Sequence, residues 1–455
     1  MSVSKQNSDE SSVEENGEAI TEDDERLKGD AIGDTLYSES WILKTLMKLT
    51  EELPSYSKNH NNFETQESNA VELDESLETD LCLLWDMSAD KEVAHCLFQH
   101  DILSLAKCVI EESVAPRLTE IGIGILANLA CQQKIGHEIL LDSELLTGVV
   151  NLMSSEDSQT IIQIVRLLDN LIHYSDNKSY HYSKNKSCSS LLDDEALWMS
   201  VAFILENSLN EELLIGSAKL LENLTRHMKH DEEVPYKNIL SGIIEAQKQL
   251  QSGNSDIVFD YPLEVRDSFV ALVSAFYNFS RHKPMQIEIV NARDRVDSFL
   301  SFHFSFLLKS VCDSTEEELA SLTASAVQAV TIFFITFSSA PLDCKILELV
   351  GHVGSKLEPY VDGENELSKC ASDYSEIVGD CFRKQLDLFA IDYFLGLLES
   401  LNTKALAFIL QAAHRTVPDR LQQLVDAARS RGSFNKVIVR IMCKECCPLD
   451  VSCLV

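Results

Sequence analysis

The sequence predicts an all-α protein, and two observations carry that prediction. The 455 residues are 45% hydrophobic but include only 16 Gly and 9 Pro, so the chain has much apolar surface to bury and few places to turn tightly. Apolar residues recur with helical periodicity from about residue 73 to about residue 440, and no stretch alternates as a half-buried strand does. A chain of this length made of helices is either a bundle or a repeat.

The N-terminal part of the chain divides into a tail and one helix. Residues 1–33 contain ten acidic and three basic residues with almost no aliphatic ones, so we expect a disordered acidic N-terminus. Residues 34–72 are expected to hold an N-terminal helix from about Leu36 to Glu52, followed by a polar linker. The apolar face of that helix consists of Trp41, Ile42, Leu43, Leu46, Met47 and Leu49.

Residues 73–400 form a series of helical blocks separated by polar insertions at 175–190, 228–236, 251–262 and 359–372. A short string recurs in these blocks: two apolar residues, a polar residue, an apolar residue and a small residue. Its polar member, which we call the rung position, is Asp86, Asn128, Asn170, Asn223, Asn278 and Thr336. The intervals are 42, 42, 53, 55 and 58 residues, and the longer ones contain insertions. A period of about 40–47 residues is typical of armadillo and HEAT repeats, so we predict a right-handed armadillo-like α-solenoid.

The rung positions have two interpretations. A polar residue repeated once per unit on an otherwise apolar helix marks the strip that lines the concave groove of the solenoid. A groove-lining Asn carries a donor and an acceptor, so it satisfies both groups of an extended peptide backbone. Alternatively, each Asn bonds to a neighbouring helix and fixes the register of the stack.

Two resemblances to known families follow from these strings. GILANLA at 124–130 resembles the groove-lining third helix of the armadillo family. The peptide-binding importins carry a Trp one turn before the Asn, where this chain has Gly124, Arg166, Lys219 and Ser274. More specifically, the blocks at 29–43, 84–97 and 116–131 resemble the serum amyloid A-like (SAAL) family. That resemblance implies an armadillo-type fold, a mainly nuclear location and a non-enzymatic role in cell proliferation.

Motifs of enzymes are absent from the sequence, so we expect no catalytic residues and no cofactor. His137-Glu138 begins a HExxH-like string that has Leu141 in place of the second His, and GHVGSK at 351–356 lacks the spacing and the Gly-Lys pair of a phosphate-binding loop. Gly122 and Gly124 lie too deep in a helix for a dinucleotide loop, and we expect them to admit a neighbouring helix.

Cysteine and histidine offer few metal ligands at recognisable spacing. We expect His95, Cys96 and His100 to be ordinary core or surface residues. The C-terminal segment 441–455 is rich in cysteine, and a zinc site there is the alternative to reduced thiols; its four thiols are Cys443, Cys446, Cys447 and Cys453.

Charge indicates the class of partner. The net charge is −35, which favours protein or peptide partners, including basic ones, and makes nucleic acid a poor candidate. Thirteen cysteines at irregular spacing and no apolar signal segment indicate a reducing compartment, the nucleus or the cytoplasm. Residues 319–342 carry no charge, but eight of them are Ser, Thr or Gln, so we expect a buried core helix and no membrane span.

Residues 401–440 are expected to form basic amphipathic helices. Eight basic and two acidic residues lie between 404 and 444, and in so acidic a chain the solenoid itself is a partner for them. The alternatives are a site for another protein and, less favoured, a site for nucleic acid. We therefore predict a scaffold or adaptor that binds partners along its groove. The alternatives are a karyopherin-like transport adaptor and a zinc- or thiol-dependent regulator that uses the C-terminal cysteines.

Overall fold

A computed structural model describes residues 30–57, 71–175, 189–228, 234–252, 261–313, 315–338 and 340–431. These residues divide into two compact units, Met1–Gln132 and Gln133–Val455. Within the described ranges the regular structure is helical, with two isolated β-bridges, Ala31 with Ser38 and Ser57 with Ser113. The predicted all-α class is confirmed. The predicted C-terminal segment 441–455 and nearly all of the acidic tail lie outside the described residues.

The α-helices of the unit Met1–Gln132 form one connected set of packed helices. Helix α2 packs on α3, and α6 packs on both α3 and α5, while α4 contacts α5. The bounds are α2 Glu39–Glu52, η1 Leu53–Tyr56, α3 Glu75–Met87, α4 Lys91–Gln99, α5 Ile102–Glu112 and α6 Pro116–Ala130. Helix α2 begins three residues later than predicted, and Met47, expected on its apolar face, is 62% exposed.

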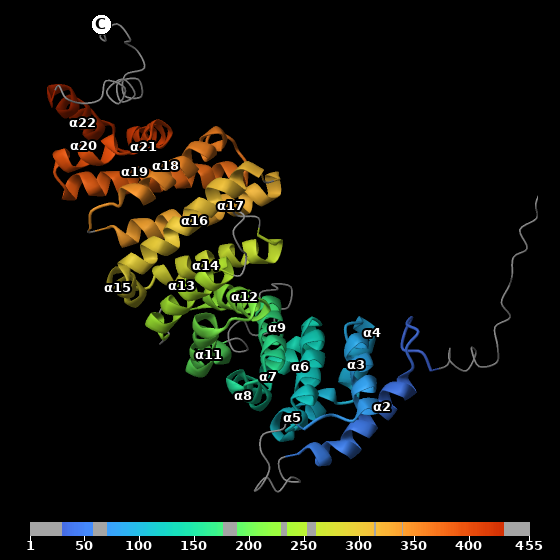
Figure 1. Cartoon of the computed structure of the whole chain (residues 1–455). Coiled ribbons are helices and arrows are strands. Elements are labelled where there is room, and N and C mark those ends of the chain that lie inside the picture. The colour runs from blue at the N-terminus through green and yellow to red at the C-terminus, as the bar shows by residue number, and fades with distance from the viewer. Residues whose placement is uncertain are drawn as a thin grey trace, which may run out of the picture. The chain divides into compact units, whose positions relative to one another are not determined.

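The unit Gln133–Val455 contains the remaining helices (Figure 1). Its first half holds α7 Gln133–Leu141, α8 Ser143–Asn151, η2 Leu152–Ser154, α9 Ser158–Ser175, α10 Ser189–Leu192, α11 Glu195–Asn207, α12 Glu211–His227, α13 Tyr236–Ser252 and α14 Leu263–Ser280. Its second half holds α15 Lys283–Asn291, α16 Arg293–Asp313, α17 Glu316–Thr336, α18 Cys344–Leu357, η3 Glu358–Tyr360, α19 Glu366–Leu388, α20 Ile391–Glu399, α21 Thr403–Thr416 and α22 Pro418–Arg431.

Helices in this second unit stack in two rows (Figure 1). In the first row α9, α12, α14, α17 and α19 follow one another, each packed on the next, and in the second row α11 packs on α13, α13 on α16 and α16 on α18. Four rung positions lie on consecutive helices of the first row. The recurring string therefore marks structurally equivalent helices, as an α-solenoid requires, because each repeat buries its apolar face only against its neighbours.

Short polar side chains begin many helices of both units. Asp74, Asp90, Asp142, Asp194 and Asn210 each accept a hydrogen bond from a backbone N–H of the first turn. Thr315 forms a full capping box with Glu318 at the start of α17. Each such cap satisfies backbone donors that a helix start leaves without partners, and it fixes where the helix begins.

Helix α17 contains the uncharged stretch that was expected to be a core helix. Glu318–Thr336 has a mean hydropathy of 1.7, which is long and apolar enough to cross a membrane, and 56% of its most apolar window is buried inside the protein. The helix packs against α14, α16 and α19. The pair α4 and α5 passes the same composition test only when joined across a 78° bend. The packing of α17 is that of a solenoid core helix.

The C-terminal basic helices continue the stack. Helix α21 packs on both α18 and α19, and α22 packs on α20 and α21. Glycines permit the close contact between α18 and α21, because a Cβ on Gly354 would lie 2.1 Å from Cε1 of Phe408. The polar stretch predicted at 359–372 is shorter in the structure, since α19 begins at Glu366 behind the N-cap Asn365.

Candidate functional site

The rung Asn128 bonds to the neighbouring helix of its own unit. It lies half-buried on α6, and its Nδ2 donates to the backbone oxygen of Trp85 at 3.0 Å and to Oγ of Ser88 at 2.9 Å. A side-chain amide has two N–H protons, so these two bonds use both. The other rung of this unit, Asp86, is exposed on α3. At Asn128 the structure therefore has the interhelical bond that the register-fixing interpretation requires.

Gly124 allows the contact between α3 and α6. A Cβ at this position would lie 2.2 Å from Cε2 of Trp85, and one at Gly122 would lie 3.2 Å from Cγ1 of Val109. The prediction that these glycines admit a neighbouring helix is confirmed. Gly124 stands where the importins carry their Trp, and here the ring of Trp85 from the adjacent helix occupies the space above it.

A charged network surrounds the rung Asn223 in the second unit. Its Nδ2 donates to Oδ1 of Asp169 on α9 at 2.6 Å, and its Oδ1 accepts from Nη1 of Arg226 at 3.1 Å. Arg226 also pairs with Glu222 at 2.7 Å. Burial raises the pKa of Asp169, while the hydrogen bond from Asn223 and the nearby charges of His173, Lys219 and Arg226 act in the opposite direction.

The rung Asn278 repeats the arrangement found at Asn128. Its Nδ2 donates to Oγ1 of Thr225 on α12 at 3.2 Å. Thr225 stands two residues after the rung of its helix, as Ser88 does after Asp86. Both hydroxyls in turn donate to the carbonyl three residues earlier, at 2.8 Å and 2.6 Å. The same hydroxyl therefore accepts from the next repeat and donates within its own helix.

The recurring strings contain a signal for this hydroxyl acceptor. Four of the six recurring strings end in a hydroxyl residue two positions after the rung; they are Ser88, Thr225, Ser280 and Ser338. In the structure Ser280 also donates to the carbonyl three residues earlier, at 2.7 Å. A hydroxyl at the small position, combined with Asn one repeat later, predicts the interhelical bond.

Thr336 does not belong with the other rungs. It is 2% exposed, and its Oγ1 donates to the carbonyl of Ile332 at 2.8 Å. The expectation that it lines a groove is wrong, because a short hydroxyl side chain satisfies itself on its own helix and is tolerated among apolar neighbours. A polar contact from α17 to α14, the preceding helix of the row, is made by Gln328, whose Nε2 lies 3.5 Å from Oγ of Ser274. Asn170 is half-buried on α9.

The basic C-terminal helices have intramolecular partners, as their charge predicted. Arg415 on α21 pairs with Glu358 and donates to Oγ of Ser375 at 3.0 Å. Arg420 on α22 pairs with Asp387 at 2.6 Å. These pairs join the C-terminal helices to the end of α18 and to α19. They are partly exposed, so each contributes about 1 kcal/mol or less to stability.

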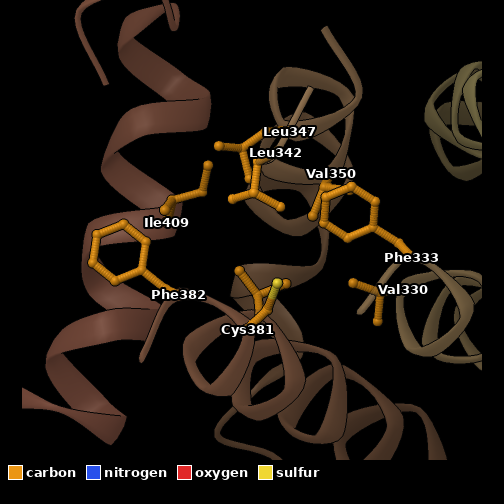
Figure 2. A pocket seen from close by; sticks show the side chains of 9 residues that line it. Val330, Phe333, Leu342, Leu347, Val350, Cys381, Phe382 and Ile409 are labelled. Carbon is orange, nitrogen blue, oxygen red and sulfur yellow. The ribbon is translucent and has the colours of Figure 1, made fainter. Parts of the chain in front are cut away.

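An apolar void of about 10 Å³ lies in the core among α17, α18, α19 and α21 (Figure 2). Figure 2 shows Phe333 and Phe382 on opposite sides of it, with Cys381 between them. A space of this size barely holds one water, so it belongs to the packing of the core. Burial raises the pKa of the Cys381 thiol to about 12.

The four C-terminal cysteines proposed as an alternative zinc site, Cys443, Cys446, Cys447 and Cys453, lie outside the described residues. The cysteines whose side chains are described are thiols that belong to no disulfide; they are Cys82, Cys96, Cys108, Cys131, Cys344, Cys370 and Cys381.

Comparison with known proteins identifies relatives over about half of the chain. Protein saal1 of Danio rerio is 30% identical over 248 residues, which are 51% of this chain and 50% of that protein. Protein SAAL1 of Homo sapiens is 28% identical over 249 residues, or 50% and 51% of the two chains. The resemblance to the SAAL family is confirmed. Protein saal1 of Xenopus tropicalis is 32% identical over 205 residues, 45% of this chain and 42% of that protein.

The chain thus spans about half the length of the curated SAAL1 relatives that it matches. No family model matches it. Among solved structures, the crystal structure of an engineered protein aligns with 88% of this chain and 98% of its own, at 14% sequence identity and a TM-score of 0.40.

Proposed function

We propose that this SAAL relative is a non-enzymatic scaffold that binds protein or peptide partners on the face of the second unit that carries Asn170, Asn223 and Asn278. Three consecutive stacked helices, α9, α12 and α14, each place a half-buried Asn near their C-terminal end. This periodic polar strip is the observation that carries the proposal. An extended segment laid across the helices meets one amide per repeat.

Charged side chains beside the rungs give the strip its chemistry. Arg166 and Arg281 are exposed next to Asn170 and Asn278, while Asp169 and Glu222 supply acidic groups between them. Such a mixed surface selects a partner by charge pattern as well as by backbone contacts. The overall charge of −35 attracts basic partners over longer distances. The resemblance to the SAAL family supports placing this scaffold in the nucleus or cytoplasm, with a role in cell proliferation.

Reversal of the two exposed arginines tests the proposal. Arg166→Glu with Arg281→Glu changes the charge beside the strip and leaves the interhelical bonds of Asn223 and Asn278 in place. Lys237→Glu on α13 is the control, because Lys237 is exposed and its replacement reverses one positive charge on the other row of helices, as each substitution of the double variant does on the first row.

Proximity labelling in cells, with quantitative mass spectrometry, compares the three proteins at equal abundance. We expect the labelling signal of the principal partners to be at least about tenfold lower for the double variant than for the wild type. A tenfold loss of affinity corresponds to about 1.4 kcal/mol of binding free energy. The control should label the same partners as the wild type. Equal partner sets for all three proteins would exclude this face as the binding surface.

A further inference from the structure

Three side chains in the first unit bring together the donor atoms of a metal site. A carboxylate oxygen of Glu39, the Sγ of Cys96 and a ring nitrogen of His100 all lie within 4.8 Å of one another. Nε2 of His100 is 2.9 Å from Oε1 of Glu39. Glu39 lies 61 residues before His100, so the arrangement depends on the fold. The sequence alone predicts ordinary residues at Cys96 and His100, since Glu39 lies far from both of them along the chain.

The local structure holds each donor in place. Cys96 and His100 are four residues apart at the end of α4, a spacing that puts two side chains on one face of a helix. Glu39 is the first residue of α2, and its backbone N–H donates to the carbonyl of Asp30 at 2.9 Å. Ser38 caps the same helix start through the backbone N–H of Trp41. Donors on fixed helix ends lose little conformational freedom when a metal binds.

The donor set fits zinc. Thiolate, imidazole and carboxylate are its usual ligands, at about 2.3 Å for sulfur and about 2.0–2.2 Å for nitrogen and oxygen. Tetrahedral geometry at these lengths needs ligand separations of about 3.3–3.6 Å. Glu39 and His100 must therefore part by a few tenths of an ångström, and Sγ must approach by up to about 1.2 Å, the difference between 4.8 Å and about 3.6 Å. Rotations about side-chain bonds supply such shifts.

Burial suits the cysteine to this role. Cys96 is 6% exposed, whereas Glu39 is exposed and His100 is half-buried, so a metal ion enters from the solvent side and meets the thiol last. The ion displaces the thiol proton, so binding releases protons and weakens as the pH falls.

We propose that Glu39, Cys96 and His100 form a zinc site with three protein ligands and a fourth position open to water or to a ligand from another molecule. The bound ion joins the start of α2 to the end of α4. This proposal is independent of the partner-binding strip, which lies in the other unit.

The test uses the full chain with Cys443, Cys446, Cys447 and Cys453 changed to Ser, so that C-terminal thiols contribute no binding. Co²⁺ titration reports thiolate ligation through its charge-transfer band in the near ultraviolet, and zinc competition gives the affinity for Zn²⁺. We expect about one ion per chain. Cys96→Ser and His100→Gln should each weaken binding at least tenfold, since even outer-shell changes cost about 10- to 100-fold.

His95→Gln is the matched control, because His95 is adjacent to Cys96 on α4 and its Nδ1 lies 2.8 Å from the carbonyl of Lys91. This variant should bind zinc like its parent. Zinc should also slow hydrogen exchange in residues 39–52 of the parent and have no such effect in Cys96→Ser. Binding of less than about half an equivalent, or equal affinity in the parent and both ligand variants, would overturn the proposal.

Discussion

Replacement of Asn128 by Ala tests whether the rungs fix the register of the stack. The change removes two interhelical hydrogen bonds, to the carbonyl of Trp85 and to Oγ of Ser88. Ser88 is fully buried, and its hydroxyl also donates to the carbonyl of Trp85 at 2.6 Å. That carbonyl therefore keeps one partner in the variant, whereas the oxygen of Ser88 loses a donor. Each lost hydrogen bond contributes about 0.5–1.5 kcal/mol, so the loss of both should lower the free energy of unfolding by about 1–3 kcal/mol.

Asn128→Asp sharpens the test because the side chain keeps its shape. A carboxylate is an acceptor only, so Asp places a negative charge against the carbonyl of Trp85 and the oxygen of Ser88. We expect Asp to destabilise the protein more than Ala. Gln99→Ala is the matched control: it removes an exposed amide from α4 of the same unit and should change stability by less than about 0.5 kcal/mol.

Urea denaturation followed by circular dichroism measures these differences, and hydrogen exchange in α3 and α6 locates them. The amide protons of both helices should exchange faster in Asn128→Ala. Stability equal to the wild type within about 0.5 kcal/mol, for Ala and Asp alike, would refute the register role. Asn128 would then be a solvated surface amide, as the groove-lining interpretation requires.

Two further predictions concern packing and pH. Gly124→Ala should destabilise the protein by about 1–3 kcal/mol, because the new Cβ displaces the ring of Trp85. Gly396→Ala is the control, because a Cβ there meets no atom within 4 Å, and it should be neutral or slightly stabilising. Thermal unfolding measures both effects. Burial lowers the pKa of His303 from 6.5 to about 3. Between these pH values the unfolded protein binds one more proton at this residue than the folded protein does. The free energy of unfolding therefore decreases as the pH is lowered through this range, by at most about 1.4 kcal/mol per pH unit. Burial raises the pKa of Asp297 to about 6, and this shift increases the free energy of unfolding as the pH is lowered below 6. The contribution of His303 is therefore measured as the difference between wild type and His303→Gln in the slope of the free energy of unfolding against pH, from pH 7 to 4.5. Equal slopes for the two proteins would contradict the reasoning.

The sequence predicted the helices and the repeat because both depend on local periodicity. The strings around Asn170, Asn223 and Asn278 located helices that stack directly on one another. The sequence could not predict which atoms form hydrogen bonds between neighbouring repeats. The acceptors of Asn223 and Asn278 lie 54 and 53 residues away, and their positions depend on the register of the stack. Thr336 matched the string but lies in the core, because its hydroxyl donates to a carbonyl of its own helix and therefore needs neither solvent nor a neighbouring helix as a partner.

The assembly of Glu39 with Cys96 and His100 was missed for a related reason. Only the spacing of Cys96 and His100 is local, and Glu39 reaches them through the packing of separate helices. The close contact at Gly124 was predictable because a glycine inside an apolar helix has few other uses. The tryptophan that fills the space was not, since Trp85 comes from another helix.

The stacking of neighbouring repeats also bears on synthesis. The interhelical bonds of the rungs join residues 40 to 54 positions apart, so each helix of a row finds its partner soon after it leaves the ribosome. A chain with such short sequence separations has a low contact order, which favours fast folding. Each new repeat adds to a surface that already exists, and its apolar face is covered before the next one is made. The nascent chain therefore grows in order, from the N-terminal end, without waiting for its last residues.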